Sequence, residues 1–389
     1  MRLNDSCNRM IFHKKMVRSM RGSILHIGKY YPPHMGGMET HLQNLVSRMS
    51  GTYDIQVLVA GDSSRKQVDH LDGAVITRVP TVGVLASMPL TPTLPGELMK
   101  MKPDLVHVHT PNPAAALAVV AAHYRGPLVV MHQSDTLGRK VLKRLCDPFV
   151  NSMLRRADRI IVASQRYVDS SVELGPFRSK CRVIPMGIKY DEGGADRDID
   201  SKKIIQDHGP RLILAVGRLV GYKGFTYLVE AMQNVDATLL LVGNGPLDAD
   251  LKEQARRCGV NHKIKFLGTI DHLDKYYRAS SIFVLPSISR AEAFGLVQLE
   301  AMAASLPVVN TDLDSGVPEI SLDGVTGRTV PPADAPALAG AINELLGNEY
   351  LRRRMGEAGR ERARREFSLD LMVERTKALY EEVLAERPG

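Results

Sequence analysis

Short apolar runs alternate along the chain with longer stretches in which apolar residues recur at helical spacing. Short runs bounded by Gly, Pro, Ser or His are typical of buried strands, and their alternation with helical patterns predicts βαβ units and a parallel sheet. In the first half of the chain the pattern predicts strands at residues 23–27, 55–60, 74–79, 105–109, 128–132, 159–163 and 182–185.

A second series of strands follows in the second half of the chain. Its predicted members are residues 212–216, 238–242, 264–267, 282–285, 307–311 and 327–330, and apolar-periodic helices fill the gaps. From residue 335 onward only helices are predicted, including a strongly charged stretch at 351–365 and an amphipathic segment at 369–384.

The length of 389 residues exceeds what one hydrophobic core usually serves, so two domains are expected. Residues 191–209 are polar and glycine-containing, which predicts a linker between domains at 23–190 and 210–365. Residues 366–389 are expected to form a helix that returns toward the first domain. The predicted fold class is α/β, with two Rossmann-like, doubly wound domains facing across a cleft.

Ligands of doubly wound sheets bind outside the carboxyl ends of the strands. We therefore expect the residues that directly follow the strands of the first domain to lie near one edge of its sheet. These residues are Gly36, His109, His132 and Ser164.

The net charge of +8 is unevenly distributed, because residues 1–200 carry +9 and residues 201–389 carry −1. Residues 1–22 hold six Lys and Arg side chains against Asp5, which gives +5, and they lack the apolar core of a secretory signal. This segment is either a basic, disordered extension or an upstream start, and we favour Met20 as the initiator.

Composition excludes several classes of function. No stripe of Lys and Arg with interleaved aromatic residues follows residue 22, and Trp is absent, so a nucleic-acid partner is not expected. No apolar run is long enough for a transmembrane helix. The four cysteines are scattered, so neither a zinc site nor a disulfide framework is predicted, and a cytosolic protein is expected.

Two glutamates flank a loop that follows a predicted strand. Glu292 lies on the loop and Glu300 in the helix after it, with Gly295 between them. The amides at the start of such a helix suit a phosphate, and a carboxylate can accept two hydrogen bonds from a ribose diol or from sugar hydroxyls. Taken alone, two glutamates at this spacing are more often solvated acids at a helix end.

Two further turns follow the first two strands of the second domain. Gly217, Arg218 and Lys223 form a cationic turn that could stabilise a leaving diphosphate without a metal, although such a pair is often only solvated. Asn244 and Gly245 lie in a tight Gly-Asn-Gly-Pro turn that could bring backbone close to a nucleotide.

The sequence does not favour a catalytic metal. Asp312 and Asp314 form an Asp-x-Asp pair, a spacing that can bind a divalent ion. The same spacing recurs at residues 248 and 250 and at residues 196 and 198, so the pair is weak evidence for a metal site. Because Arg218 and Lys223 already supply positive charge, neither a metal nor another cofactor is predicted.

In this order, the segments resemble the retaining GT-B glycosyltransferases of the family 4 type over nearly the whole chain. The matching segments are PPHMGGMETHL, DLVHVHTPNP, VVMHQSD, RVIPMGI, GRLVGYKG, GNGP, AEAFGLVQLEAMAASLPVV and GVPEI. The resemblance is closest to bacterial polysaccharide and O-antigen mannosyltransferases. One departure is Ser305, where a glycine is usual.

The resemblance implies a role for each site residue. Arg218 and Lys223 would hold the diphosphate, Glu300 the ribose, and Glu292 and His132 the transferred sugar. The remaining donor-binding residues would be Gly36, Gly37, Asp135, Gly217, Asn244, Gly245, Phe294, Gly295, Leu296 and Val297. Asp135 is one residue further from His132 than in the usual pattern.

The implied function is transfer of a hexosyl group, with retention, from a nucleotide-sugar to a glycan or lipid-linked acceptor in cell-surface polysaccharide synthesis. GDP-mannose is the favoured donor, while a UDP-sugar with a small soluble acceptor stays open. A nicotinamide-dependent oxidoreductase is less favoured because no G-x-G-x-x-G turn follows the first strand. A non-catalytic nucleotide-sugar-binding protein would not need the cations and Glu292.

Residues 137–166 combine eight Lys and Arg residues with interleaved apolar residues. Such a stretch predicts a basic amphipathic helix that could lie on an anionic membrane surface at the inner face of the membrane. The alternative is an ordinary surface helix whose apolar side packs on the sheet.

Overall fold

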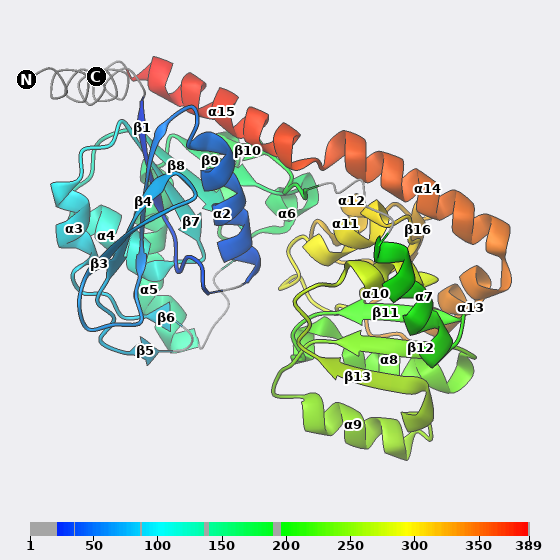
Figure 1. The fold of residues 1–389 in the computed structure, drawn as a ribbon. Coiled ribbons are helices and arrows are strands. Elements are labelled where there is room, and N and C mark those ends of the chain that lie inside the picture. The colour runs from blue at the N-terminus through cyan, green and yellow to red at the C-terminus, as the bar shows by residue number, and fades with distance from the viewer. Residues whose placement is uncertain (1–21, 35, 86–87, 136–139, 190–195, 388–389) are drawn as a thin grey trace, which may run out of the picture. The chain divides into compact units, whose positions relative to one another are not determined.

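The computed structural model describes residues 22–34, 36–85, 88–135, 140–189 and 196–387, and the basic segment 1–21 lies outside them. The chain forms two compact units (Figure 1). Unit 1 comprises the chain up to Val162, Ser171–Ile184 and the residues from Val373 onward. Unit 2 comprises Ala163–Ser170 and Pro185–Met372.

Unit 1 is built on an eight-stranded sheet in the order β10-β9-β8-β7-β1-β2-β4-β3, parallel except for β3. Its strands are β1 (Ser23–Ile27), β2 (Asp54–Ala60), β3 (Gln67–Leu71), β4 (Ala74–Val79), β7 (Leu105–Thr110), β8 (Leu128–His132), β9 (Arg159–Val162) and β10 (Cys181–Val183). Its helices are α2 (Gly37–Met49), α3 (Leu94–Lys100), α4 (Pro113–Ala121), α5 (Lys140–Arg156) and most of α15 (Leu369–Glu386).

The chain order reverses at β1, whose neighbours in the sheet are β2 and β7. Almost every residue of the central strands β1, β7 and β8 is buried, as expected for a sheet covered on both faces, although these strands also carry histidines among their apolar residues. The sequence pattern misses β3, whose five residues are all exposed, and the short hairpin of β5 (Val84–Leu85) and β6 (Met88–Pro89). Exposed edge strands lack the apolar signal by which buried strands are recognised.

Unit 2 contains a six-stranded parallel sheet in the order β13-β12-β11-β14-β15-β16. Its strands are β11 (Leu212–Val216), β12 (Thr238–Val242), β13 (Ile264–Gly268), β14 (Ile282–Val284), β15 (Val308–Thr311) and β16 (Gly327–Val330). Its helices are α6 (Gln165–Ser170), α7 (Asp196–His208), α8 (Phe225–Ala231), α9 (Asp248–Arg257), α10 (Asp274–Ala279), α11 (Leu296–Ala303), α12 (Val317–Ile320), α13 (Ala335–Gly347) and α14 (Glu349–Glu366).

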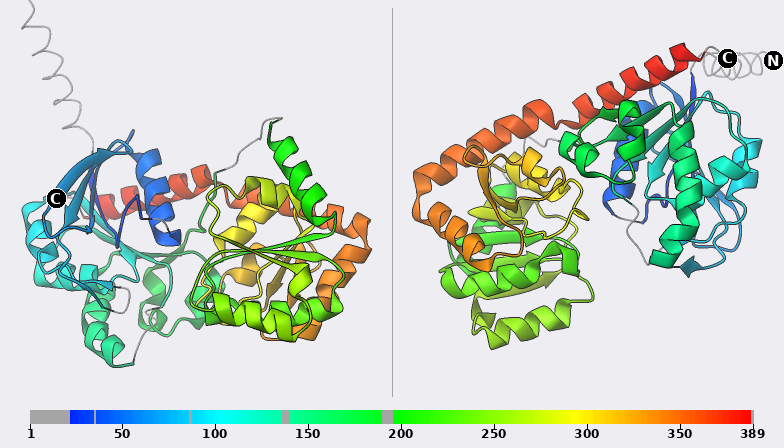
Figure 2. Two further views of the ribbon diagram at one scale, coloured as in Figure 1. Left: turned by 60° about the horizontal axis from the view of Figure 1, so that its bottom comes forward. Right: turned by 180° about the vertical axis from the view of Figure 1, so that it is seen from behind.

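The strand order of unit 2 reverses between β11 and β14. One core cluster joins residues of the sheet, such as Leu239 and Val284, to Leu228 of α8 and Ile342 of α13. Helices lie on both faces of the sheet (Figure 2), so each unit is a doubly wound α/β fold, as predicted. In such folds the crevice for a ligand opens where the strand order reverses.

The predicted linker at 191–209 is wrong over most of its described length. Residues 196–208 form α7, which packs along α10 within unit 2. Ser201 and Ile204 are buried, but too few apolar residues recur for the pattern to reveal a helix. Residues 191–195 lie outside the described part of the chain.

Two further boundaries differ from the predicted domains. The segment Ala163–Ser170 belongs to unit 2, although it follows a strand of unit 1. Within unit 2 the backbone amide of Arg166 donates to Glu319, and Arg290 donates to the carbonyl of Ser170 at 2.6 Å. At the other end unit 2 extends past the predicted limit at residue 365 to Met372.

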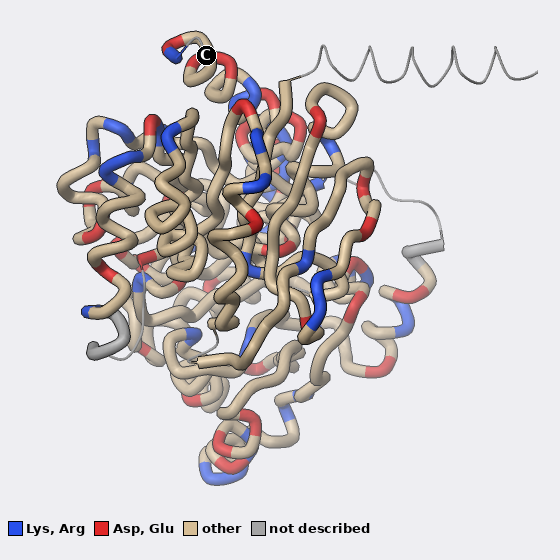
Figure 3. The backbone as a smooth tube through the Cα atoms, turned by 90° about the vertical axis from the view of Figure 1, so that its left-hand side faces the viewer, with Lys and Arg blue, Asp and Glu red and all other residues tan. Residues whose placement is uncertain are grey.

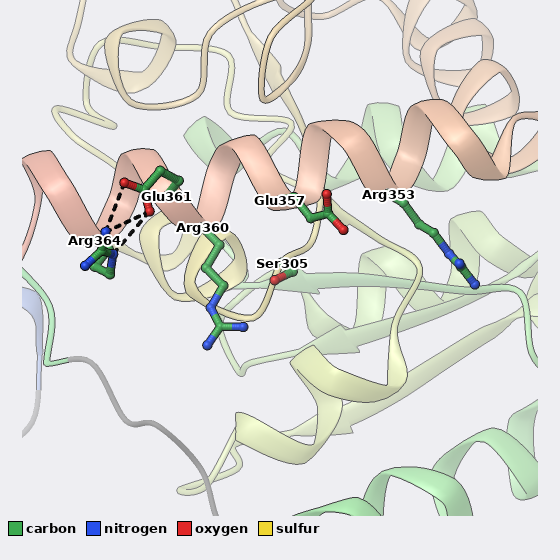
Figure 4. Close-up of a pocket in the computed structure, with 6 residues that line it drawn as sticks. All are labelled: Ser305, Arg353, Glu357, Arg360, Glu361 and Arg364. Atoms are coloured by element: carbon green, nitrogen blue, oxygen red, sulfur yellow. Dashed lines mark hydrogen bonds and ion pairs between the residues drawn. The ribbon is translucent and has the colours of Figure 1, made fainter.

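Ser305 adopts φ 61, a left-handed conformation that favours the glycine usual at this position. Its carbonyl oxygen lies only 2.0 Å from where a Cβ on Gly356 of α14 would stand, so α14 packs closely on this turn. Ser305 also lines a hollow of about 510 Å³ under α14 (Figure 4). This hollow contains none of the predicted site residues; it is lined by Ser305, Arg353, Glu357, Arg360, Glu361 and Arg364.

In the part of the chain that the structure describes, no helix combines the length and apolar character needed to span a membrane. Basic and acidic positions are interspersed over the face drawn in Figure 3.

Candidate functional site

Lys223 and Glu292 form an ion pair in unit 2, with Lys223 Nζ 2.5 Å from Glu292 Oε2. Lys223 follows β11 and Glu292 follows β14, so the pair stands where the strand order of the sheet reverses. Each side chain is only about a tenth exposed, and Ser287 also donates a hydrogen bond to Glu292 Oε2 at 2.9 Å. Two of the predicted catalytic residues are therefore in direct contact.

Arg218, the other predicted cation, is exposed at the carboxyl end of β11. Its neighbour Gly217 donates its amide to the carbonyl of Val242 and lies close to the Lys223 side chain. The end of β11 therefore presents one exposed and one nearly buried cation. Positive charge held in this way suits a diphosphate.

Glu300 lies on α11 and accepts a hydrogen bond from the hydroxyl of Tyr277 on α10 at 2.7 Å. Burial raises the pKa of Glu300, the Tyr277 hydrogen bond acts to lower that pKa, and Asp274 raises it. Burial and the charge of Glu300 raise the pKa of Tyr277, which stays a hydrogen-bond donor. Tyr277 is thus a positioning residue for Glu300 that the sequence pattern does not reveal.

The loop that carries Phe294, Gly295, Leu296 and Val297 leads into α11. Gly295 adopts φ 79 and precedes a helix that has no side-chain N-cap, so the first amides of α11 are left for another acceptor. A Cβ at Gly295 would stand 2.8 Å from the tip of the Leu285 side chain, so a larger residue would require that side chain to move, in addition to the strain of the positive φ. An anion is the natural partner of such a helix start.

A buried amide network behind this loop fixes its shape. Gln298 donates to the carbonyls of Phe294 and Val317, at 3.1 and 3.2 Å. Asn310 on β15 donates to Gln298 Oε1 at 3.0 Å and accepts a hydrogen bond from Thr329. Sequence analysis missed these residues, because a single Gln or Asn carries no spacing signal.

The turn after β12 is held against the end of β11. Asn244 donates its side-chain amide to Thr269 at 2.9 Å, and its carbonyl accepts the Leu219 amide. A Cβ at Gly245 would stand 2.3 Å from the Leu219 carbonyl oxygen. The predicted Gly-Asn-Gly-Pro turn is therefore a close backbone contact beside Arg218.

In unit 1, His132 ends β8 and is buried, and its Nε2 lies 3.2 Å from Asp135 Oδ1. Ser171 donates a 2.5 Å hydrogen bond to the same carboxylate oxygen. Ligand-type atoms of His132, Asp135 and Glu173 all lie within 4.8 Å of one another. Despite the extra residue in the motif, Asp135 contacts His132 directly.

Gly36 and Gly37 stand at the start of α2, after β1. The Glu39 carboxylate lies near Gly36, where a Cβ would stand 2.5 Å from Glu39 Oε2, whereas nothing crowds Gly37. The chain order of the unit 1 sheet reverses at β1, so this helix start lies at the predicted edge of unit 1.

His109 and Ser164 do not take the places expected of them. His109 is buried, and its Nε2 lies 3.1 Å from the Nδ1 of His26. Its side chain therefore contacts another buried histidine of unit 1 rather than lining a crevice. Ser164 groups with unit 2, where it lies against Gly316. The position of a residue after a strand predicts its location but not the face to which its side chain points.

The Asp-x-Asp pair of Asp312 and Asp314 already has a cationic partner. Arg166 Nη2 lies 2.8 Å from Asp312 Oδ1 and 3.5 Å from Asp314 Oδ1. The two carboxylates therefore hold an arginine in this structure, which gives them a role in the packing of α6 within unit 2.

Replacing Tyr277 by phenylalanine should raise the KM for the donor by about three- to tenfold, because one hydrogen bond that orients Glu300 is lost. The same hydrogen bond lowers the pKa of Glu300. If Glu300 holds a ribose, its carboxylate form accepts the hydroxyls, so donor binding should weaken as the pH falls through this pKa. In the variant that loss should begin at a higher pH.

The measurement is the donor KM and the kcat as functions of pH. Tyr276→Phe, one residue away on α10, is the matched control and should behave like the parent. Identical pH profiles for Tyr277→Phe and the parent would remove the positioning role.

Comparison with known proteins matches both halves of the chain to glycosyltransferase families. Residues 35–192 match the family described as Glycosyltransferase Family 4, and residues 196–362 match Glycosyl transferases group 1. The chain is 30% identical to O-antigen chain mannosyltransferase C of Escherichia coli, over 93% of this chain and 98% of the relative. It is 31% identical to the D-rhamnosyltransferase WbpZ of Pseudomonas aeruginosa, over 89% and 92%.

Solved structures agree on the fold. Sucrose-phosphate synthase from Thermosynechococcus elongatus superposes with a TM-score of 0.77 at 23% identity, covering 94% of this chain and 100% of that one. Anabaena HepE in complex with UDP-glucose gives a TM-score of 0.76 at 20% identity, covering 92% and 99%. With two doubly wound units and relatives matched along their whole length, the chain belongs to the GT-B glycosyltransferases of the family 4 type.

Proposed function

We propose that the protein transfers a hexosyl group, with retention, from a nucleotide-sugar to a glycan or lipid-linked acceptor. The observation that carries the proposal is the contact between Lys223 and Glu292 at the strand-order reversal of unit 2, with Glu300 on the adjoining helix. Cations and carboxylates in this arrangement suit the three parts of a donor, which are its diphosphate, its sugar and its ribose.

Each side chain then has a chemical task. The bond between the anomeric carbon and the diphosphate oxygen breaks, and Arg218 and Lys223 stabilise the negative charge that develops on the leaving group. The acceptor oxygen bonds to the same face of the anomeric carbon, and its proton passes to an oxygen of the leaving diphosphate. Glu292 accepts a hydrogen bond from the sugar, and Glu300 binds the ribose diol.

The residues of unit 1 are assigned to the sugar and the phosphates of the donor. His132 is buried and held by Asp135, so one ring nitrogen is fixed and the ring is oriented. We assign His132 to the transferred sugar, and the start of α2 at Gly36 and Gly37 to the phosphates.

GDP-mannose is our first choice of donor. The support is the full-length similarity to an O-antigen chain mannosyltransferase and to a D-rhamnosyltransferase. A UDP-sugar is the second choice, because HepE, which shares the fold, has been solved with UDP-glucose.

Products of reactions with a panel of nucleotide-sugars test this proposal. We expect one donor, GDP-mannose first, to release its nucleoside diphosphate and to yield a glycoside with the anomeric configuration of the donor, read by NMR. Inversion at the anomeric carbon would contradict the retaining mechanism, and consumption of a UDP-sugar alone would replace the assigned donor.

Turnover should stay within about twofold of its original rate after brief exposure to excess EDTA, because side chains rather than an ion supply the positive charge at the diphosphate. Initial rates with and without EDTA measure this. Loss of activity that magnesium or manganese restores would show that a cation completes the donor site.

Membrane association is proposed on a narrower basis than the sequence suggested. The stretch 137–166 is not one helix, because α5 ends at Arg156 and β9 follows. Arg156 donates to the Tyr124 and Gly126 carbonyls and Arg159 pairs with Glu382, so these cations are engaged within the fold. The basic count of the sequence therefore overstates the charge available to a membrane.

The middle of α5 still offers an amphipathic surface. Leu145 is 65% exposed and Phe149 is 37% exposed, and Arg144 beside them is also exposed. On the other side of the helix Val150 and Met153 are buried in unit 1. We propose that this exposed patch contacts anionic headgroups near a lipid-linked acceptor.

A vesicle flotation assay tests the patch in protein lacking residues 1–19. The parent should float with anionic but not neutral vesicles, and salt should release it because the attraction is screened. Substitution of both Leu145 and Phe149 by serine should abolish flotation, while Ile199→Ser, at an exposed apolar residue of α7, serves as the control. No flotation of the parent at low salt would leave a soluble acceptor as the better proposal.

A further inference from the structure

Four histidines cluster in the interior of unit 1. His26 on β1 is paired in register with His107 on β7, and His109 lies two residues further on the same face of the sheet. His41 on α2 approaches His109 with ring centroids 5.8 Å apart. All four side chains are at least nine-tenths buried.

The ring nitrogens of the cluster are close enough to share one ligand. One ring nitrogen from each of His26, His107 and His109 can be chosen so that all three lie within 4.8 Å of one another. A tetrahedral zinc ion bound to histidine nitrogens needs separations of about 3.4 Å, so adjustments of roughly 1 Å would suffice.

Hydrogen bonding leaves the cluster incomplete. His107 Nδ1 lies 2.6 Å from the hydroxyl of Tyr380 on α15, and His26 Nδ1 lies 3.1 Å from His109 Nε2. Among the described residues, one ring nitrogen of each of the four histidines is buried without a hydrogen-bond partner. These atoms are His26 Nε2, His41 Nε2, His107 Nε2 and His109 Nδ1. Buried polar atoms are normally paired, so these four leave room for a partner; because a neutral ring has a single N–H, a metal bound by both His26 and His109 would replace their mutual hydrogen bond.

The chemistry of the cluster suits a metal rather than an anion. Neutral imidazole is a preferred ligand of zinc and related transition metals. The Tyr380 contact with His107 resembles the outer-shell hydrogen bond that fixes the ring of a metal-binding histidine.

We propose that His26, His107 and His109 bind one divalent transition-metal ion, with zinc the best match, and that Tyr380 orients His107 toward it. His41 or a water molecule completes the coordination. The ion is structural, because it joins the two central strands of unit 1 and, through Tyr380, the C-terminal helix. It does not take part in the chemistry of the donor site, and brief exposure to EDTA would not reach so deeply buried an ion.

Metal analysis of the untagged full chain, expressed with and without added zinc, tests the proposal. We expect about one transition-metal ion per chain from zinc-supplemented cells, and a melting temperature at least roughly 5 °C higher than that of metal-depleted protein. His109→Gln should reduce the metal content to less than about a fifth. His70→Gln, at an exposed histidine of the same unit, is the matched control and should retain the ion.

Tyr380→Phe keeps all the histidines and gives a second route if His109→Gln does not fold. This variant should lose its metal to a chelator at least about tenfold faster than the parent. Absence of stoichiometric metal from the parent, with equal melting temperatures in both preparations, would overturn the proposal. Equal metal content in His109→Gln and the parent would also overturn it, because the ion would then be bound elsewhere.

Discussion

Replacing Lys223 by alanine should reduce kcat/KM by roughly 30- to 1000-fold, which corresponds to about 2–4 kcal/mol of transition-state stabilisation. The effect is expected to be large because the Nζ is nearly buried beside Glu292, where charge is only weakly screened. Removing it also leaves the Glu292 carboxylate without its cation. Steady-state kinetics over a range of donor concentrations measure the loss.

Lys252→Ala provides the matched control for this experiment. Lys252 is also a lysine of unit 2 paired with an acid, but its partner is Asp248 on an exposed helix surface. The control should keep full activity, and both variants should give the circular dichroism spectrum of the parent. A folded Lys223→Ala protein with turnover within about twofold of the parent would show that the diphosphate site is wrongly assigned.

Gly243→Ala should destabilise unit 2 by more than about 3 kcal/mol and abolish donor binding. Gly243 follows β12 with φ 135, and a Cβ there would stand 1.9 Å from the carbonyl oxygen of Gly217. Gly243 and Gly217 follow adjacent strands of the sheet, so their backbones cannot move apart to relieve this contact without disrupting the sheet. Urea unfolding and nucleotide titration measure the two effects.

Gly259→Ala separates the clash from the backbone strain. Gly259 also has a positive φ, of 70, but nothing lies within 4 Å of the position of its Cβ. This control should cost only about 1 kcal/mol, the usual penalty of a left-handed conformation. Equal destabilisation by the two variants would contradict the role given to the close contact at Gly243.

Much of the fold follows from the sequence because buried parallel strands are almost continuously apolar. The strands at residues 23–27, 128–132 and 212–216 were predicted to the residue for this reason. The exposed strand Gln67–Leu71 and the helix Asp196–His208 were not found, because their stability comes from neighbours rather than from an apolar pattern. Tertiary contacts of this kind leave little trace in a local window.

The candidate site also contains residues that the sequence reveals and residues that it does not. Lys223 and Glu292 could be proposed together because each follows a strand at the reversal of strand order, where motif and topology coincide. Tyr277 and Asn310 could not, since each acts through one hydrogen bond to a residue distant in sequence. The histidine cluster was missed because the spacing rules for metal sites consider neighbours in sequence, whereas His26 and His107 meet only across two strands.

The most direct test of the donor site is the melting temperature of the protein with GDP, UDP or inorganic phosphate in metal-free buffer. A ligand that binds only the folded state raises the melting temperature by mass action. We expect one nucleoside diphosphate, GDP first, to raise it by several degrees in the parent and in Lys252→Ala, but not in Lys223→Ala or Gly243→Ala. No shift with any nucleoside diphosphate, or an equal shift in Lys223→Ala, would contradict a donor site at the carboxyl ends of β11 and β14.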